Sequence, residues 1–239
     1  MLDTELISRL QKEAVSLDNP VSAIVNTIAD IQRDKINTQI KNCTKCSISS
    51  NCKSLICGQT DRAFILIISD YPSYQEINSG EHFFPFEHTE VLSVLKRLIS
   101  LYTDPLNVAW CNVVNCYPTE NKRLARPPTI AEITNCKSHV FNLINYLQVT
   151  GNLHCIMTMG SVALGALFPK LTIEAAKTQE QLDYFGTPVF PTYNLLYTIG
   201  NTERSSARQE AVVLDIMSMF QNLMQQYPDL PIHEPTEKF

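Results

Sequence analysis

Long hydrophobic runs are missing from this sequence of 239 residues. A run such as AFILII, at residues 63–68, is far shorter than the roughly 18 apolar residues that a bilayer-spanning helix needs. The first residues also lack a basic stretch followed by an apolar run, the pattern of a secretory signal peptide. We therefore expect no transmembrane segment and no signal peptide, and we expect a cytoplasmic or nuclear-type reducing compartment.

An excess of positive charge is missing as well. The chain has 19 basic and 24 acidic residues and a net charge of -5, which argues against broad nonspecific binding of polyanions, because that binding depends on clustered Lys and Arg. A local exception is the loop TENKRLARPP at 119–128, with Lys122, Arg123 and Arg126. Two interpretations are open for this loop, a solvated turn or a contact to phosphate.

Strand-like and helix-like segments alternate along the chain. Continuous apolar runs of strand length lie at 63–69, 107–114, 153–159 and 187–193. Helical spacing of apolar residues is found between and after them, at 89–102, 129–148, 160–168 and about 205–227. The alternation predicts an α/β fold, a three-layer α/β/α domain with a central, mostly parallel sheet of four strands.

The two ends of the chain have a different character from this alternating core. Helical periodicity before residue 40 predicts an N-terminal helical extension over residues 1–40. The alternating pattern then occupies residues 41–227, and we expect residues 228–239 to form a flexible tail. No internal repeat is visible in the sequence.

Polar residues follow several of the predicted strands. Asp70 follows the first strand, Asn112 lies in the second, and Asn194 follows the last. Ligands of parallel sheets bind outside the carboxyl ends of the strands, so these side chains are expected at one edge. Each also has an ordinary structural interpretation, because Asp and Asn are common in turns and at helix caps.

Eight cysteines are present, and their spacing suggests two kinds of metal site. Disulfides are rare in reducing compartments, so metal binding, catalysis or simple burial must explain these cysteines. Four of them fall within fifteen residues, Cys43, Cys46, Cys52 and Cys57, and on their own would suit a four-thiolate zinc site. The five histidines show no paired metal spacing. Cys111 and Cys155, inside apolar strands, are expected to be core residues.

The order of the motifs resembles the iron–sulfur uracil-DNA glycosylases called family 4. That family has a C-x-x-C pair, a strand ending in G-E-A-P-G, then G-x-P-F-V-G, N-V-V-K-C-R-P-P, a further cysteine and T-Y-H-P-S-x-L-L-R. The chain carries, in the same order, Cys43-x-x-Cys46, SDYPS at 69–73, GEHFFP at 80–85, NVVNCYP at 112–118, Cys136 and PTYNLLYTIGN at 191–201. The resemblance covers about residues 40–222.

This resemblance implies a role for each matching residue. Asp70 stands at the place of the catalytic carboxylate, Phe83 at the place of the ring that stacks on uracil, and Asn112 at the place of the asparagine that reads the base. Phosphate contacts would come from Lys122, Arg123 and Arg126, and the DNA-facing loop would include Leu195 and Leu196. The four family thiolates that hold a 4Fe-4S cluster correspond to Cys43, Cys46, Cys116 and Cys136.

The chain also departs from the family pattern. Asn194 replaces the histidine that would steady the uracil carbonyl, and loss of such a preorganised donor costs about 10²- to 10³-fold in rate. Asp70 is shorter by one methylene than the family glutamate, and Tyr71 replaces a small residue and is expected to contact the base.

Two hypotheses follow from the resemblance and its departures. The first is a divergent glycosylase that releases uracil or a related pyrimidine from DNA. The second is a weak or inactive DNA-binding, replication-associated module that keeps the fold and the cluster. We expect a monomer that binds single- or double-stranded DNA, with the N-terminal helices available to a replication or repair protein.

Overall fold

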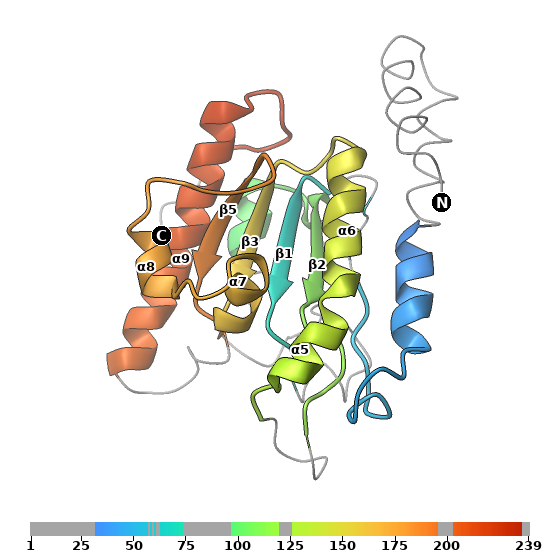
Figure 1. Ribbon diagram of the computed structural model, residues 1–239. Helices are drawn as coiled ribbons and strands as arrows, with labels where there is room; N and C mark the ends of the chain where they lie inside the picture. Colours follow the sequence, from blue (N-terminus) through green and yellow to red (C-terminus); the bar gives the residue numbers. More distant parts are fainter. Residues whose placement is uncertain are drawn as a thin grey trace, which may run out of the picture.

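A five-stranded sheet forms the centre of the protein (Figure 1). The computed structural model describes residues 32–56, 58, 60, 63–73, 97–119, 126–195 and 203–235. In these ranges the strands are β1 (Ile65–Ser69), β2 (Val108–Asn112), β3 (Cys155–Met159), β4 (Leu182–Tyr184) and β5 (Thr187–Thr192). Their order is β2-β1-β3-β5-β4, with β4 antiparallel to β5 and all other pairs parallel. The α/β prediction is confirmed, but the prediction of four strands is wrong, because β4 has only three residues and gives no periodic signal.

Helices connect and cover these strands. The labelled helices are α5 (Ile130–Cys136), α6 (Ser138–Val149), α7 (Ser161–Leu167), α8 (Ile173–Lys177) and α9 (Glu203–Gln226), with a 3-10 turn η1 (Pro105–Asn107). Residues 32–41 and 97–102 are also helical. The single helix expected over 129–148 is interrupted at Lys137, and its predicted start is confirmed, because Thr129 and Glu132 form a capping box.

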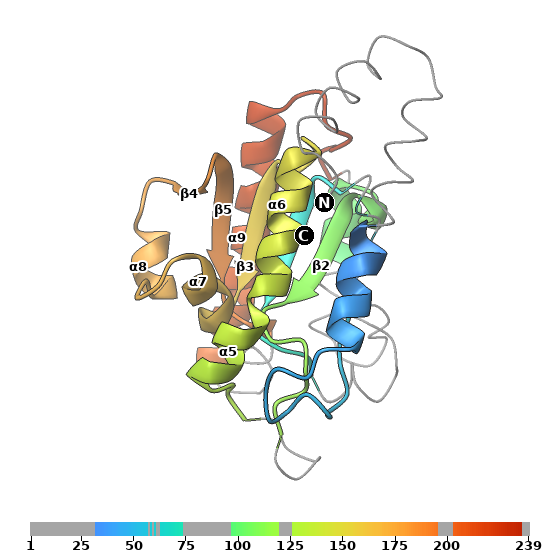
Figure 2. The same ribbon diagram turned by 45° about the vertical axis from the view of Figure 1, so that its right-hand side comes forward.

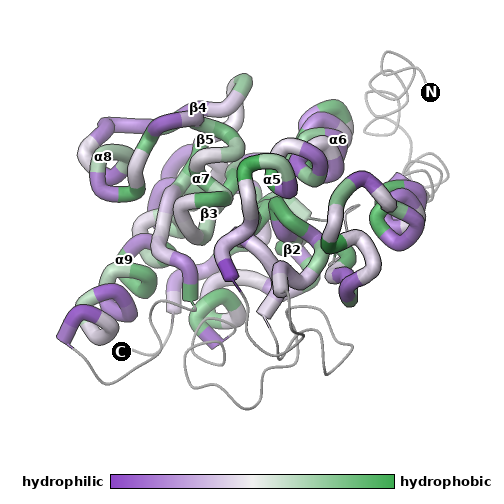
Figure 3. The backbone as a smooth tube through the Cα atoms, turned by 60° about the horizontal axis from the view of Figure 1, so that its bottom comes forward, coloured by the Kyte–Doolittle hydropathy of each residue, from purple (hydrophilic) through white to green (hydrophobic). Residues whose placement is uncertain are grey.

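Alternate residues of β1 belong to two separate hydrophobic clusters. Leu66 and Ile68 pack with residues of α6, α7 and the helix at 32–41. Ile65 and Ile67 pack with residues of α9 and of the helix at 97–102. Successive strand side chains point to opposite faces, so the sheet is apolar on both, as its continuous apolar runs predict. Figure 2 shows α6 passing in front of the strands with α9 behind them, and in Figure 3 α9 alternates between hydrophobic and hydrophilic stretches.

The strand order creates a switch point beside β1. The chain passes from β1 to β2 on one side and then returns to β3 on the other. Ligands of open α/β sheets bind in the crevice outside the carboxyl ends of the strands at such a point. The first polar residue beyond β1 at this edge is Asp70.

Part of the expected flexible tail contacts the domain. The Thr103 hydroxyl donates to the Pro231 carbonyl (2.9 Å), and the His233 backbone N–H donates to the Tyr102 carbonyl (2.9 Å). Ile232 packs against the cluster that contains α9. Among the helices in the described ranges, none is both long and apolar enough to cross a membrane.

Candidate functional site

Asp70 occupies the switch point and is almost completely buried, with 1% of its surface exposed. Its Oδ1 accepts a hydrogen bond from the Ala163 backbone N–H (2.8 Å), and it also accepts from the Val162 backbone and from the Asn194 side chain. Burial raises the pKa of Asp70 to about 6, although these three hydrogen bonds act in the opposite direction. The structure therefore brings together the two predicted catalytic residues, Asp70 and Asn194.

Gly160 makes room for the Asp70 carboxylate. Its backbone has a φ of +111°, and a Cβ added here would lie 2.2 Å from Asp70 Oδ2. Only glycine adopts this conformation readily, and only glycine leaves the space. The Gly160 N–H donates to the Thr192 carbonyl (2.9 Å), which holds the turn after β3 against the end of β5. Our sequence analysis missed Gly160, although a glycine between a strand and a helix was a visible signal.

Asn112 ends β2 and is fully buried. Its Nδ2 donates to the Ser54 hydroxyl (3.0 Å), while its Oδ1 has no hydrogen-bond partner among the described residues. A buried carbonyl oxygen without a partner carries a cost of about 1–3 kcal/mol, which a ligand N–H would remove. Ser54 was not predicted, because 58 residues separate it from Asn112.

Only some of the other residues predicted to contact DNA lie in the described ranges. Tyr71 is 8% exposed and belongs to the cluster that contains α6 and α7. Leu195 is 7% exposed and packs in the α9 cluster, and its contact with DNA stays a prediction. Four other predicted residues lie outside the described ranges: Phe83, Lys122, Arg123 and Leu196.

Arg126 is engaged inside the protein. Its two terminal nitrogens donate to the two carboxylate oxygens of Glu132 (2.9 and 2.7 Å). The hydrogen bonds from Arg126 lower the pKa of Glu132 to about 2, against the effect of burial, and the N-cap interactions with Thr129 act in the same direction as Arg126. A bidentate pair of this kind fixes the end of the basic loop at the start of α5. The structure thus gives Arg126 a structural role, and its contact with phosphate stays a prediction.

Four cysteines from three separate segments line one cavity. These are the residues that the family resemblance selects: Cys43, Cys46, Cys116 and Cys136. Ile40, Lys45, Asn115, Asn135 and His139 complete the lining. The cavity lies where the loop after the helix at 32–41 meets the segment after β2 and the end of α5.

Backbone contacts hold these segments together. Lys53 and Cys116 form an isolated antiparallel bridge, and the Ser54 N–H donates to the Asn115 carbonyl (2.8 Å). On the other side, Asn135 Nδ2 donates to the Lys45 carbonyl (3.1 Å). Because Ser54 also contacts Asn112, the loop that carries Cys43 and Cys46 is joined directly to the polar edge of the sheet.

The surroundings of Cys116 and Cys136 favour protonated thiols. Burial and the neighbouring Cys136 and Cys46 raise the pKa of Cys116 to about 12, so in the absence of a cation the thiol keeps its proton. A bound metal reverses this balance, because its positive charge deprotonates a coordinating thiol. Cys136 Sγ accepts hydrogen bonds from the backbone N (3.3 Å) and Nδ2 (3.4 Å) of Asn115, as iron–sulfur ligands accept them from their surroundings.

No group of three or more His, Cys, Asp or Glu side chains in the described part of the chain is arranged to hold one metal ion. A 4Fe-4S cluster binds each thiolate through a different iron, so its ligands stand farther apart than those of zinc. Of the zinc alternative, Cys52 is exposed and does not line the cavity, while Cys57 lies outside the described residues.

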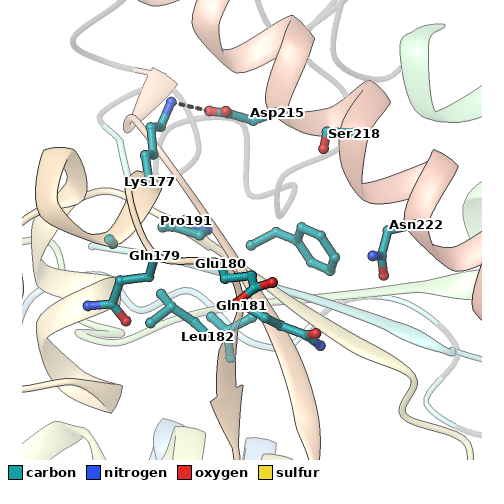
Figure 4. Close-up of a pocket in the computed structure, with 12 residues that line it drawn as sticks. Lys177, Gln179, Glu180, Gln181, Leu182, Pro191, Asp215, Ser218 and Asn222 are labelled. Carbon is teal, nitrogen blue, oxygen red and sulfur yellow. Dashed lines mark hydrogen bonds and ion pairs between the residues drawn. The ribbon is translucent and has the colours of Figure 1, made fainter.

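A second pocket lies apart from both groups, between α8, β5 and α9 (Figure 4). Lys177 and Asp215 form an ion pair at one end, and Ser218 and Asn222 line the α9 side. None of the predicted site residues lines it.

The comparisons with known proteins are negative. No protein-family model matches the chain, and no curated protein matches it.

Proposed function

We propose that this protein is a divergent uracil-DNA glycosylase that hydrolyses the N-glycosidic bond of uracil or a related pyrimidine in DNA. One observation carries the proposal: Asp70, Asn194 and Asn112 are buried at the carboxyl edge of one sheet, joined through Ser54 to a cavity lined by four cysteines. The order of these residues in the sequence is the order of the family motifs. The helices on both faces of the sheet support the three-layer α/β/α form of this fold.

Asn112 is the proposed reader of the base. A glycosylase holds its target base outside the DNA stack and hydrogen-bonds its pairing edge. The free Oδ1 of Asn112 is an acceptor for the imide N–H of uracil. Cytosine has no N–H at that ring position, so the same oxygen would disfavour it. Phe83 is the proposed stacking partner, and Tyr71 the proposed neighbour of the base.

Asp70 is the proposed electrostatic partner of the sugar. When the C1′–N bond breaks, its electron pair leaves with the base and positive charge develops on the sugar, which water then attacks at C1′. A buried carboxylate stabilises this charge far better than an exposed one does, because little water screens it. Asn194 and the amides of α7 hold Asp70 in one orientation. Lys122 and Arg123 are proposed to contact DNA phosphates.

The four cysteines are proposed to hold a 4Fe-4S cluster that fixes the loop at 43–56 against Cys116 and α5. The cluster supplies a rigid cross-link between segments distant in sequence. Such a site suits a reducing compartment. We further propose that the protein acts as a monomer and that the N-terminal helices bind a replication or repair protein.

A second function is favoured by one feature of the same site. Asp70 already receives hydrogen bonds from two α7 amides and from Asn194, as a residue that merely caps α7 would. In that case the protein would bind uracil-containing or single-stranded DNA without releasing the base.

A single-turnover assay separates these two functions. Purified protein is incubated with an end-labelled single-stranded oligonucleotide that contains one uracil, beside the Asp70→Asn variant. A glycosylase yields an abasic site, and Asp70→Asn slows its formation by at least about 100-fold. Binding of the oligonucleotide by the wild type with no abasic product would support the binding module instead.

A further inference from the structure

His139 is the one histidine that lines the cysteine cavity in the described part of the chain. It lies in the first turn of α6, one turn beyond Cys136, and only 5% of its surface is exposed. Neither Nδ1 nor Nε2 has a hydrogen-bond partner among the described residues. Among the described residues the ring is thus a buried polar group without a hydrogen-bond partner, although Asn115, whose Oδ1 also lacks one, lines the same cavity.

The N–H group of the His139 ring requires a hydrogen-bond acceptor beside it. The imidazole of His139 carries at least one N–H donor, one in its neutral form and two in its protonated form. An unmatched buried donor carries a cost of about 1–3 kcal/mol. An acceptor inside the cavity removes that cost, and the acceptors of a thiolate-bound iron site are its sulfur atoms.

We propose that His139 donates its ring N–H to a sulfur of the iron–sulfur cluster and thereby raises the reduction potential of the cluster. The inference rests on the cluster proposed above and deepens it by assigning a residue that is not a ligand. Its role is that of a positioning residue, which acts through the cluster and touches no substrate.

The direction of the change in reduction potential follows from the charge of the cluster. Reduction adds an electron to the cluster and makes its sulfur atoms more negative, so a donor to sulfur stabilises the reduced form more than the oxidised form. Asn115 already donates to Cys136 Sγ on one side of the cavity. A second donor from His139 acts in the same direction from α6.

Two variants distinguish the effect of the hydrogen-bond donor of His139 from the effect of the volume of its ring. His139→Leu fills much of the same space without a donor, whereas His139→Gln retains one. We expect the reduction equilibrium to shift toward the oxidised form by about tenfold in His139→Leu, which is about 59 mV for one electron. His139→Gln should stay closer to the wild type. The potentials are measured by a redox titration followed by electron paramagnetic resonance of the reduced cluster.

A measurement on the wild type keeps the test independent of how the variants fold. Pulsed electron paramagnetic resonance of protein labelled with ¹⁵N-histidine should detect a weak coupling between the cluster spin and a ring nitrogen. Absence of that coupling, or a coupling as large as that of a nitrogen bound to iron, overturns the inference. Equal potentials in wild type and His139→Leu also overturn it. Wild-type protein without iron would instead refute the cluster itself, so the two failures are distinguishable.

Discussion

At the carboxyl edge of the sheet Asp70 receives hydrogen bonds from Ala163 and Asn194, whereas in the cysteine cavity both ring nitrogens of His139 lack a partner among the described residues. Among the described residues the Asp70 carboxylate is thus satisfied by the protein, whereas Asn112 Oδ1 and Thr158 Oγ1 have no hydrogen-bond partner. In the described part of the cavity, the His139 ring has no partner, while Cys136 Sγ accepts two hydrogen bonds from Asn115. This difference supports the proposal that the cavity holds a bound group.

The largest expected effect comes from removing a cavity thiol. Cys136→Ala deletes one of the four proposed ligands and the acceptor of both Asn115 hydrogen bonds. We expect loss of nearly all bound iron and of the visible absorbance of the cluster, measured by metal analysis and absorption spectra. Cys52→Ala is the matched control, because Cys52 is exposed and outside the cavity. Loss of metal from Cys52→Ala together with bound zinc in the wild type would favour the zinc alternative.

The second-largest expected effect tests whether the space at Gly160 fixes the position of the Asp70 carboxylate at the carboxyl edge of the sheet. Gly160→Ala places a Cβ 2.2 Å from Asp70 Oδ2 at a φ of +111°. We expect a loss of at least about 2 kcal/mol in the free energy of unfolding and a loss of base release, measured by denaturant titration and the single-turnover assay.

Gly165→Ala provides the control for this substitution. Gly165 lies in α7, and an added Cβ meets no atom within 4 Å. Alanine is favoured over glycine inside a helix, so stability should change by less than about 1 kcal/mol, in the favourable direction. If both variants behaved alike, Gly160 would not constrain Asp70.

A third prediction concerns the pH dependence of base release. Burial raises the pKa of Asp70 from 3.8 to about 6, and the proposed chemistry requires the ionised form. The single-turnover rate should fall about tenfold per pH unit below about pH 6 and stay level above it. The same shift makes the folded protein hold this proton more tightly, so the stability that Asp70 contributes at low pH is lost as the pH rises through about 6. A rate that is level from pH 5 to 8 would show that Asp70 does not take part.

Much of the fold followed from patterns within short segments. Each predicted strand matches an observed one within two residues at either end, and the Thr129 capping box is present, because a run of apolar residues or a cap depends on neighbours in sequence. The three-residue strand β4 and the five-residue helix α8 were missed, since neither is long enough to show a period.

The candidate site was predictable only where a motif defined it. Asp70, Asn112 and the four cavity cysteines follow from ordered motifs, whereas Ser54 was missed because its partner is 58 residues away. His139 was missed for a different reason: a lone histidine has no spacing, and only burial shows that it has no partner.

The smallest expected effect tests the assignment of Arg126, which was predicted to bind phosphate but pairs with Glu132. Glu132 is 3% exposed, and Arg126 and the N-cap of α5 lower the pKa of its carboxyl from 4.5 to about 2. This pair therefore stabilises the fold above about pH 4.5, and its contribution is lost as the pH falls toward 2. Glu132→Gln should lower the free energy of unfolding at pH 7 by about 1–2 kcal/mol, allowing for the partial exposure of Arg126.

Between about pH 4.5 and 2, the free energy of unfolding of Glu132→Gln should also decline less than that of the wild type. Denaturant titration at each pH measures this difference. Affinity for single-stranded DNA discriminates the two roles of Arg126. If the pair is structural only, Glu132→Gln leaves DNA affinity at neutral pH unchanged, because Arg126 never reaches a phosphate. A clear gain in affinity, with a steeper salt dependence, would show that Glu132 had been competing with phosphate for the same guanidinium, and the basic loop would then contact DNA through Arg126 as well.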